Sequence, residues 1–349
     1  FRSLTDQPGP ALQYGATEGH PPLREEIARF MASKGVQGVT AGDLIVTTGS
    51  QQALDLIAKT LLDEGDVALV EAPTFLATIQ CFRLYGPRVL GVPIDADGVQ
   101  VDRLEEMVVR HRPKLVYIIP TFGNPSGAML SHERRLKILQ MAVRHRVVVV
   151  EDDPYGDLYF HAEPPPSLLA LSHQVPGSRE WLLHCGSLSK VLSPGLRVGW
   201  LIAPPGLLQR ATMCKQFSDA HTSTYAQATA AEYLKSGRMP ATLAHVRRVY
   251  GQRAAAMGAA LRRELGDAFN FNQPQGGLFF WGRLTGAGGA IHDGQAYAQK
   301  AIEHNVAFVP GAPFFADQPD PASLRLSFAT SDLEKIEQGV QRLGVALRA

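Results

Sequence analysis

The segment GSLSKVLSPGLRVGW, residues 186–200, places a single lysine shortly after a hydrophobic run and among small hydroxylated residues. A lysine that is partly shielded from water and close to another cation loses its proton readily, and its neutral amine attacks carbonyl carbons. Arg197, seven positions after Lys190, is a suitable cation. Because an isolated lysine near a turn is usually an ordinary surface residue, this interpretation depends on what the fold brings beside it.

A carboxylate follows another apolar run, VVVVED, residues 147–152. Removing an unpaired carboxylate from water is costly, so Asp152 needs a cation or hydrogen-bond donors as partners. Glu151 and Asp153 compete for the same role. An acid and base pair, as in glycosidases, suits these positions poorly because consecutive residues of a strand point to opposite faces. We therefore predict one acid that faces a cation.

Two further segments predict sites for anions. In TTGSQQALDL a strand ends at a glycine and a helix begins, with Ser50 as the expected N-cap. The free N–H groups there either hold a phosphate or are simply capped by the serine. Arg325 lies in the apolar stretch LRLSFAT, where a guanidinium needs either a ligand carboxylate or an internal acid. No GxGxxG or GxxxxGK[ST] motif points to a nucleotide.

Short apolar runs alternate with amphipathic helical stretches through the first 205 residues. The runs are apolar on both faces, as expected for strands that helices cover on both sides. This alternation predicts an α/β fold with a mainly parallel sheet. Ligands bind beyond the carboxyl ends of such strands, so the loops that follow them should converge. Besides the residues above, these loops contain Gln51, Phe75, Asn124, Tyr155, Ser187 and Ser189.

After residue 205 the pattern changes to long helical stretches, followed by three apolar segments between further helices. The sequence Arg238-Met239-Pro240 interrupts the helical pattern, because proline breaks the interior of a helix. We therefore predict two domains, 1–238 and 239–349, of which the second is a smaller α/β domain. Residues 1–20 are expected to form an arm or to contact the small domain.

The composition is that of an ordinary globular protein. Of the 349 residues 45% are hydrophobic, and the formal charge is only +1, so nothing favours nucleic acid or an anionic membrane. No apolar stretch is long enough to span a membrane, and the N-terminus is not a signal peptide. The three cysteines lack metal-ligand spacing, so we expect reduced thiols, a cytoplasmic location and no metal. The chain begins at Phe1 rather than Met, so we expect upstream residues.

The chain resembles the class I/II aminotransferases of fold type I, which depend on pyridoxal 5'-phosphate. It is most similar to the branch of kynurenine/2-aminoadipate aminotransferases, LysN-like enzymes and the catalytic-like domains of MocR regulators. The resemblance covers nearly the whole chain through an ordered set of segments: YGATEGHPPLREEIARFM, GSQQALDL, EAPTF, NPSG, EDDPYGDL, GSLSKVLSPGLRVGW, VPGAPFF and RLSFAT. It implies an aspartate-aminotransferase-like large domain, with a mainly parallel seven-stranded sheet between helices, and a smaller α/β domain.

The resemblance also implies roles around the cofactor ring. Lys190 would carry the internal aldimine and later move a proton, and Asp152 would pair with the pyridinium nitrogen. Asn124 and Tyr155 would hydrogen-bond the phenolic oxygen of the ring, and Phe75 would stack on its face. In relatives the position of Phe75 is commonly a tyrosine. Stacking on the cofactor ring should therefore be kept here, while the hydrogen bond of the tyrosine hydroxyl is lost.

Further implied roles concern the phosphate, the substrate and the partner subunit. Arg325, together with Asn124, would bind the α-carboxylate of the substrate. The phosphate would be held by Ser50, Gln51, Ser187, Ser189, Arg197 and, from the neighbouring subunit of a homodimer, Tyr14. Ser126 replaces the usual threonine, and we expect the part of the N-terminal arm that covers the site in relatives to precede residue 1.

These implications give two alternative functions. The first is a transaminase that moves an amino group from a 2-aminoadipate-type, aromatic or branched-chain amino acid to a 2-oxo acid, expected to be 2-oxoglutarate, by a ping-pong route. A narrower variant keeps the cofactor but catalyses β-elimination or decarboxylation. The second function is that of the cofactor-binding effector domain of a MocR-type transcription regulator, fused to an upstream DNA-binding domain.

Overall fold

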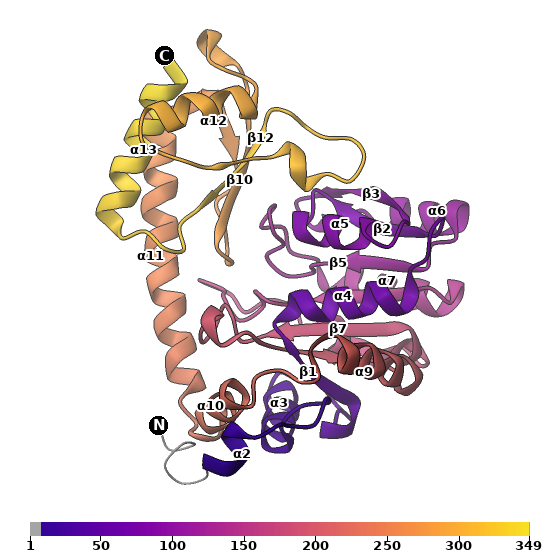
Figure 1. Ribbon diagram of the computed structural model, residues 1–349. Coiled ribbons are helices and arrows are strands. Elements are labelled where there is room, and N and C mark those ends of the chain that lie inside the picture. Colours follow the sequence, from indigo (N-terminus) through magenta and orange to yellow (C-terminus); the bar gives the residue numbers. More distant parts are fainter. Residues whose placement is uncertain (1–7, 349) are drawn as a thin grey trace.

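The computed structural model describes residues 8–348, so residues 1–7 of the expected arm and residue 349 lie outside the described part. Its large sheet is the structural centre of the chain (Figure 1). The strands are β1 (Leu44–Thr48), β2 (Val67–Ala72), β3 (Arg88–Asp95), β4 (Gly98–Val99), β5 (Leu115–Ile118), β6 (Val148–Asp152), β7 (Leu182–Ser187) and β8 (Val198–Ile202).

The strand order is β1-β8-β7-β6-β5-β2-β3-β4. The pairs from β3 through β2, β5 and β6 to β7 are parallel, whereas β8 runs antiparallel to both β1 and β7. The α/β class and the mainly parallel sheet are thus confirmed. The sheet has eight strands rather than the seven implied by the resemblance, because the two-residue β4 pairs with the end of β3 at the edge.

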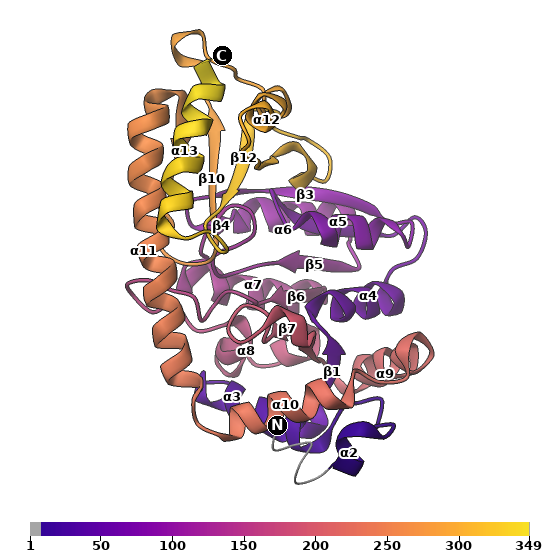
Figure 2. The ribbon, with the colours of Figure 1, turned by 60° about the vertical axis from the view of Figure 1, so that its left-hand side comes forward.

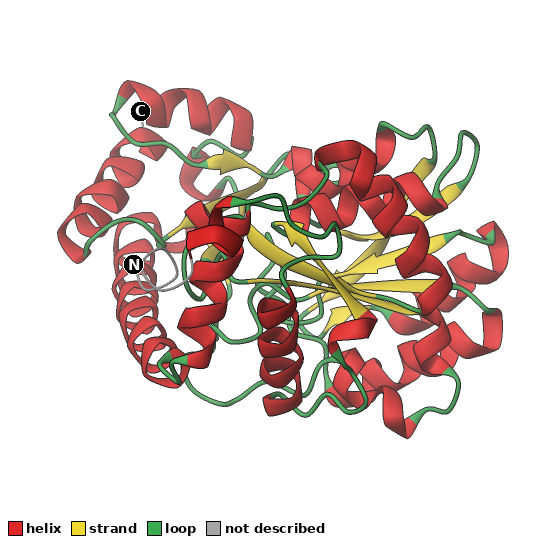
Figure 3. Cartoon of the chain, turned by 60° about the horizontal axis from the view of Figure 1, so that its bottom comes forward, coloured by secondary structure: helices red, strands yellow, loops and turns green. Residues whose placement is uncertain are grey.

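Helices cover both faces of this sheet (Figure 3). The strands β6, β7 and β8 are buried along their whole length, as expected for strands that lie between two helical layers. The amphipathic helical stretches expected between the apolar runs are thus present, for example as α4, α6 and α7. The helices of this part are α2 (Pro8–Leu12), α3 (Pro21–Ser33), α4 (Ser50–Leu61), α5 (Leu76–Arg83), α6 (Val101–His111), α7 (His132–His145), α8 (Leu168–Leu171), α9 (Pro205–Asp219) and α10 (Thr224–Lys235).

A smaller antiparallel sheet and three helices follow. The sheet has the order β11-β12-β10-β9, and α11 runs beside it and on along the large part of the molecule (Figures 1 and 2). With 27 residues, α11 is about 40 Å long. The elements are α11 (Met239–Leu265), β9 (Phe269–Phe271), β10 (Phe279–Leu284), α12 (Gly294–Glu303), β11 (Val309–Pro310), β12 (Ser323–Ser327) and α13 (Leu333–Arg348).

Two separate clusters of buried apolar residues lie in these two parts. The first surrounds the large sheet and includes Met239 and Leu243 from the start of α11. The second lies around the small sheet and begins with Ala254. Because α11 contributes to both clusters, the domain boundary after residue 238 stays a prediction. Among residues 8–348, no helix has the length and apolar character needed to cross a membrane, and no group of potential ligands suits a metal ion.

Candidate active site

One cavity of about 300 Å³ lies where the large sheet meets the small one. Every site residue predicted from the sequence except Tyr14 lines it. Tyr14 is exposed and packs edge-on against His221 with ring centroids 5.8 Å apart, so its predicted contact with a partner subunit stays untested. The lining residues are Ser50, Gln51, Phe75, Ile119, Asn124, Asp152, Pro154, Tyr155, Ser187, Ser189, Lys190, Pro194, Arg197, Phe279 and Arg325.

Lys190 lies in the connection between β7 and β8 and is half-buried. Its ammonium group forms no ion pair or hydrogen bond with any residue that the structure describes. Burial lowers the pKa of Lys190, and the positive charges of Arg197 and Arg325 lower it further. The environment therefore favours the neutral, nucleophilic amine that the sequence predicts.

Asp152 is the last residue of β6 and is almost completely buried. The hydroxyl of Tyr117, on the neighbouring strand β5, donates a 2.7 Å hydrogen bond to its Oδ2. The other oxygen, Oδ1, is buried and has no hydrogen-bond partner in the described part of the chain. Burial raises the pKa of Asp152 to about 7. A cation beside Oδ1 would lower this pKa again, so the carboxyl group is suited to a positively charged ligand.

Tyr117 is a residue that the sequence reasoning missed. It stands in the run LVYIIP, where a tyrosine is easily taken for one more apolar core residue. The structure buries it completely, and its pKa is well above the ordinary value because of burial and the charge of Asp152. The available signal was its position one strand away from Asp152, since a buried phenol requires a hydrogen-bond partner.

The start of α4 forms another wall of the cavity, and here one prediction was wrong. The N-cap is Gly49 and not Ser50, which is the first residue of the helix and caps nothing with its side chain. Gly49 has φ = 78°, which glycine adopts without strain. An added Cβ at Gly49 would lie 2.5 Å from Nη2 of Arg197, and one at Gly199 would lie 2.7 Å from the nitrogen of Ser50. The two glycines therefore let the arginine and β8 approach the helix start.

Hydroxyl and guanidinium groups complete this wall. The Ser187 hydroxyl donates a 2.9 Å hydrogen bond to Oγ of Ser189 and also accepts the backbone N–H of Ser189. Nη2 of Arg197 lies 3.4 Å from the carbonyl oxygen of Thr48 and is otherwise open to solvent. The free N–H groups at the start of α4, two hydroxyls and one cation thus surround a space that suits a dianion.

Arg325, on β12, approaches the cavity from the small sheet. Its Nη1 donates a 2.8 Å hydrogen bond to Oδ1 of Asn124, and its guanidinium carbon lies 4.3 and 4.9 Å from the ring centroids of Phe279 and Phe314. Its Nε is buried without a partner. No Asp or Glu of residues 8–348 forms an ion pair with it, so the internal salt bridge left open by the sequence is not formed. The guanidinium remains free for a carboxylate ligand.

The family model of aminotransferases of class I and II matches residues 4–343. The chain belongs to this family. It is therefore a transaminase that uses pyridoxal 5'-phosphate, with the fold of the aspartate-aminotransferase-like enzymes. The 2-aminoadipate transaminase of Thermus thermophilus is 44% identical over 99% of this chain and 84% of the relative. The HTH-type transcriptional regulator YisV of Bacillus subtilis is 32% identical over 95% of this chain and 66% of the relative.

A solved structure gives the same result for the fold. LysN, the α-aminoadipate aminotransferase of Thermus thermophilus, was solved in complex with N-(5'-phosphopyridoxyl)-L-leucine. It is 44% identical to this transaminase and superposes with a TM-score of 0.93 over 99% of this chain and 86% of that structure.

The groups that lack partners fit pyridoxal phosphate. Its aldehyde needs a primary amine, its ring nitrogen needs an anion and its phosphate needs N–H groups and cations. Lys190, Oδ1 of Asp152 and the start of α4 with Arg197 offer these three features around one cavity. Nε of Arg325 is a further free donor, for which the carboxylate of a substrate is a suitable partner.

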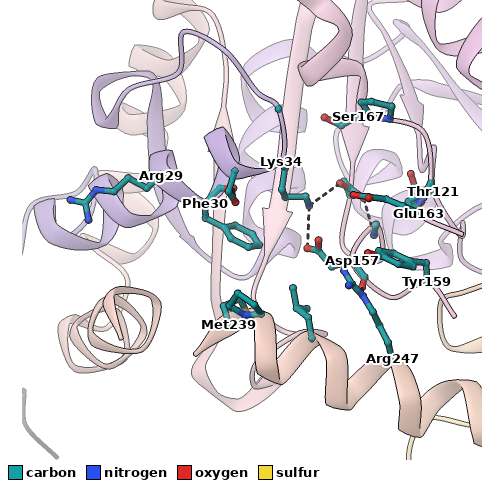
Figure 4. Close-up of a pocket in the computed structure, with 18 of the residues that line it drawn as sticks. Arg29, Phe30, Lys34, Thr121, Asp157, Tyr159, Glu163, Ser167, Met239 and Arg247 are labelled. Atoms are coloured by element: carbon teal, nitrogen blue, oxygen red, sulfur yellow. Dashed lines mark hydrogen bonds and ion pairs between the residues drawn. The ribbon is translucent and has the colours of Figure 1, made fainter. Parts of the chain in front are cut away.

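A second and larger cavity, of about 920 Å³, lies between α3, the start of α11 and the 153–167 loop (Figure 4). Its lysine, Lys34, lies 3.6 Å from Asp153 and 3.1 Å from Asp157 in two ion pairs. Arg247 stacks on Tyr159, with 3.7 Å between the guanidinium carbon and the ring centroid. Lys34 is thus paired with two carboxylates and Arg247 is stacked on an aromatic ring, so neither cation is left without a partner.

Proposed function

We propose that this transaminase moves an amino group from a 2-aminoadipate-type, aromatic or branched-chain L-amino acid to 2-oxoglutarate by a ping-pong route. The observation that carries the proposal is the convergence of Lys190, Asp152 and Arg325 on one cavity. Pyridoxal phosphate supplies an aldehyde that condenses with primary amines and a ring that accepts the electrons left when a proton is removed from the substrate α-carbon.

Lys190 is proposed to bind the cofactor and then, as a free amine, to take the proton from the α-carbon and return it to the cofactor carbon. Its lowered pKa supports this role, because the amine must be neutral to react with the aldehyde and to take the proton, and it delivers that proton as the ammonium. Asp152, held by Tyr117, is proposed to keep the ring nitrogen protonated. Tyr155 is buried beside the cavity, and we propose that it and Asn124 donate to the phenolic oxygen.

The remaining contacts are proposed to orient the cofactor and the substrate. Phe75 would stack on the ring, and Arg325 would bind the α-carboxylate that all amino acids share. The phosphate would lie against the start of α4, where N–H groups and the helix dipole favour an anion. Its ligands would be Ser50, Gln51, Ser187, Ser189 and Arg197.

The choice of donors rests on the relatives. The 44% identical protein from Thermus thermophilus is a 2-aminoadipate transaminase, and its solved complex contains a phosphopyridoxyl-leucine. An acidic side chain and a branched one are therefore both reasonable candidates here. We further propose a homodimer in which Tyr14 reaches the phosphate of the partner subunit, and a cytoplasmic enzyme whose three cysteines stay reduced.

A coupled assay tests the proposal. The purified holoenzyme is incubated with 2-oxoglutarate and, in turn, 2-aminoadipate, leucine, phenylalanine and aspartate, and glutamate formation is measured. We expect turnover with at least one of the first three donors and parallel lines in double-reciprocal plots. Intersecting lines would exclude the ping-pong route, and turnover of aspartate alone would overturn the proposed donor class.

The regulator alternative is supported by the match to YisV, and the same assay addresses it. An effector domain would bind the cofactor and shift its absorbance on addition of an amino acid, but it would form no glutamate over many cofactor equivalents. Sustained turnover would instead favour the metabolic enzyme.

A further inference from the structure

Arg135, on α7, is the largest side chain that is fully buried in the described part of the chain. Burial lowers its pKa, and the charges of Glu151 and Asp153 act in the opposite direction. A buried guanidinium is costly unless its donors are satisfied. The hydrogen bonds of Arg135 go to backbone carbonyls and one hydroxyl rather than to a carboxylate.

These hydrogen bonds join Arg135 to three short segments of the chain, which lie 5 to 31 positions away in the sequence. Nε donates to the carbonyl oxygen of Leu130 at 3.0 Å, and Nη1 donates to that of Pro166 at 3.2 Å. Nη2 donates to the carbonyl oxygen of Pro120 and to the hydroxyl of Thr121, both at 2.9 Å. Leu130 also donates its N–H to the Pro120 carbonyl at 2.8 Å. One side chain thus fixes both ends of the 120–130 loop.

The two loops that Arg135 joins both contribute to the cofactor cavity. Asn124 lies inside the 120–130 loop, and Tyr155 lies near the start of the 153–167 loop, which contains Pro166 near its end. Thr121 and Ser167, one from each loop, line the larger cavity (Figure 4). Arg135 itself does not line the cofactor cavity.

We propose that Arg135 is a positioning residue that holds Asn124 and Tyr155 at the distance needed to donate to the phenolic oxygen of the cofactor. This inference rests on the roles proposed above for these two residues. Arginine suits the task because its planar guanidinium directs five donors toward several acceptors at once. A lysine has three donors around one nitrogen and cannot reach all four acceptors.

The test compares Arg135→Lys and Thr121→Val with the wild-type holoenzyme. Donors to the phenolic oxygen stabilise its anion and so weaken proton binding by the lysine-bound cofactor. In Arg135→Lys, the pH midpoint of the cofactor absorbance change should therefore rise by about 0.5–1 pH unit. We expect kcat per bound cofactor to fall about 10-fold with KM of the donor changed less than about 3-fold.

Thr121→Val removes only one of the four acceptors and should shift the midpoint and kcat in the same direction, with kcat lowered about 2- to 3-fold. The matched control is Arg134→Lys. Arg134 precedes Arg135 on the same helix, but its guanidinium pairs with Asp95 at 2.6 Å and donates to the carbonyl oxygens of Gly98 and Val99, not to a residue of either loop. This control variant should leave the midpoint and kcat unchanged.

The outcomes separate the inference from the proposed function. If both test variants lose thermal stability but keep the wild-type midpoint and kcat, Arg135 is a structural residue only and the inference is wrong. If the wild-type protein with bound cofactor shows no pH-dependent absorbance and no turnover, the proposed function fails instead.

Discussion

The two cavities beside the loop that begins at Asp153 differ in one decisive respect. The larger, of about 920 Å³, contains a lysine whose pKa is raised, because Asp153 and Asp157 outweigh the effect of burial. The smaller, of about 300 Å³, contains a lysine whose pKa is lowered by burial, Arg197 and Arg325. Our choice of the smaller cavity as the active site therefore does not rest on volume. It rests on polar groups without partners, because these are costly until a ligand satisfies them.

Replacing each of the two lysines in a separate variant gives the largest expected difference in transaminase activity. Lys190→Ala should lower transamination by more than about 1,000-fold, because it removes both the cofactor attachment and the proton carrier. The long-wavelength absorbance band of the bound cofactor should also disappear while the circular dichroism spectrum is retained. Lys34→Met should keep turnover and the absorbance band but melt at a lower temperature, since it leaves two carboxylates unpaired. Turnover by the Lys190 variant would refute the comparison.

Asp152→Asn should lower kcat by about 100-fold or more. The amide still accepts the Tyr117 hydrogen bond but cannot balance the charge on the ring nitrogen. KM for the donor should change much less, since the charge matters most as electrons move into the ring. Steady-state kinetics at saturating cofactor measure this, and an unchanged kcat would contradict the assigned pairing.

Arg325→Ala should raise KM about 10- to 100-fold, because a charged hydrogen-bond donor to the substrate is lost. The increase should be similar for 2-aminoadipate, leucine and phenylalanine, since all three share the α-carboxylate. Arg283→Ala, on the neighbouring strand β10, is the control, because Arg283 pairs with Asp320 at 2.9 Å and does not line the cavity. A change confined to one donor would indicate a side-chain role instead.

The smallest expected effect is on the pH dependence of the apoprotein. The pKa of Asp152 is about 7 in the folded state and about 3.9 in the unfolded state. Between these values the folded state holds the extra proton, so the free energy of unfolding falls as pH rises, by up to about 1.4 kcal/mol per pH unit.

Urea melts of the apoprotein at pH 5, 6, 7 and 8 measure this slope, and Asp152→Asn should have a shallower one. Some slope should remain in the variant, because burial raises the pKa of Glu71 to about 8. Equal slopes in the two proteins would mean that Asp152 is not the buried, unpaired acid described here.

The sequence predicted which residues share a cavity better than it predicted local detail. Eleven of the twelve predicted site residues line the cavity, because most of them lie at or just after the ends of strands, and the ends of neighbouring strands meet at one edge. The N-cap at Ser50 was wrong because serine is common at that position, whereas here the cap is Gly49, with φ = 78° and no room for a Cβ beside Arg197. The roles of these residues and of Tyr14 remain proposals.

The order of strands and helices and the chemical types at the strand ends were determined by the sequence alone, because apolar runs and caps are local patterns. Only the tertiary structure decided which groups satisfy one another. Tyr117 meets Asp152 across 35 positions, and Arg325 meets Asn124 across 201. Arg135 joins two loops that no sequence pattern connects. Such contacts depend on which strands pair and on where the loops between them pack. The same arrangement leaves Asp152 Oδ1 and Arg325 Nε without a hydrogen-bond partner among the described residues.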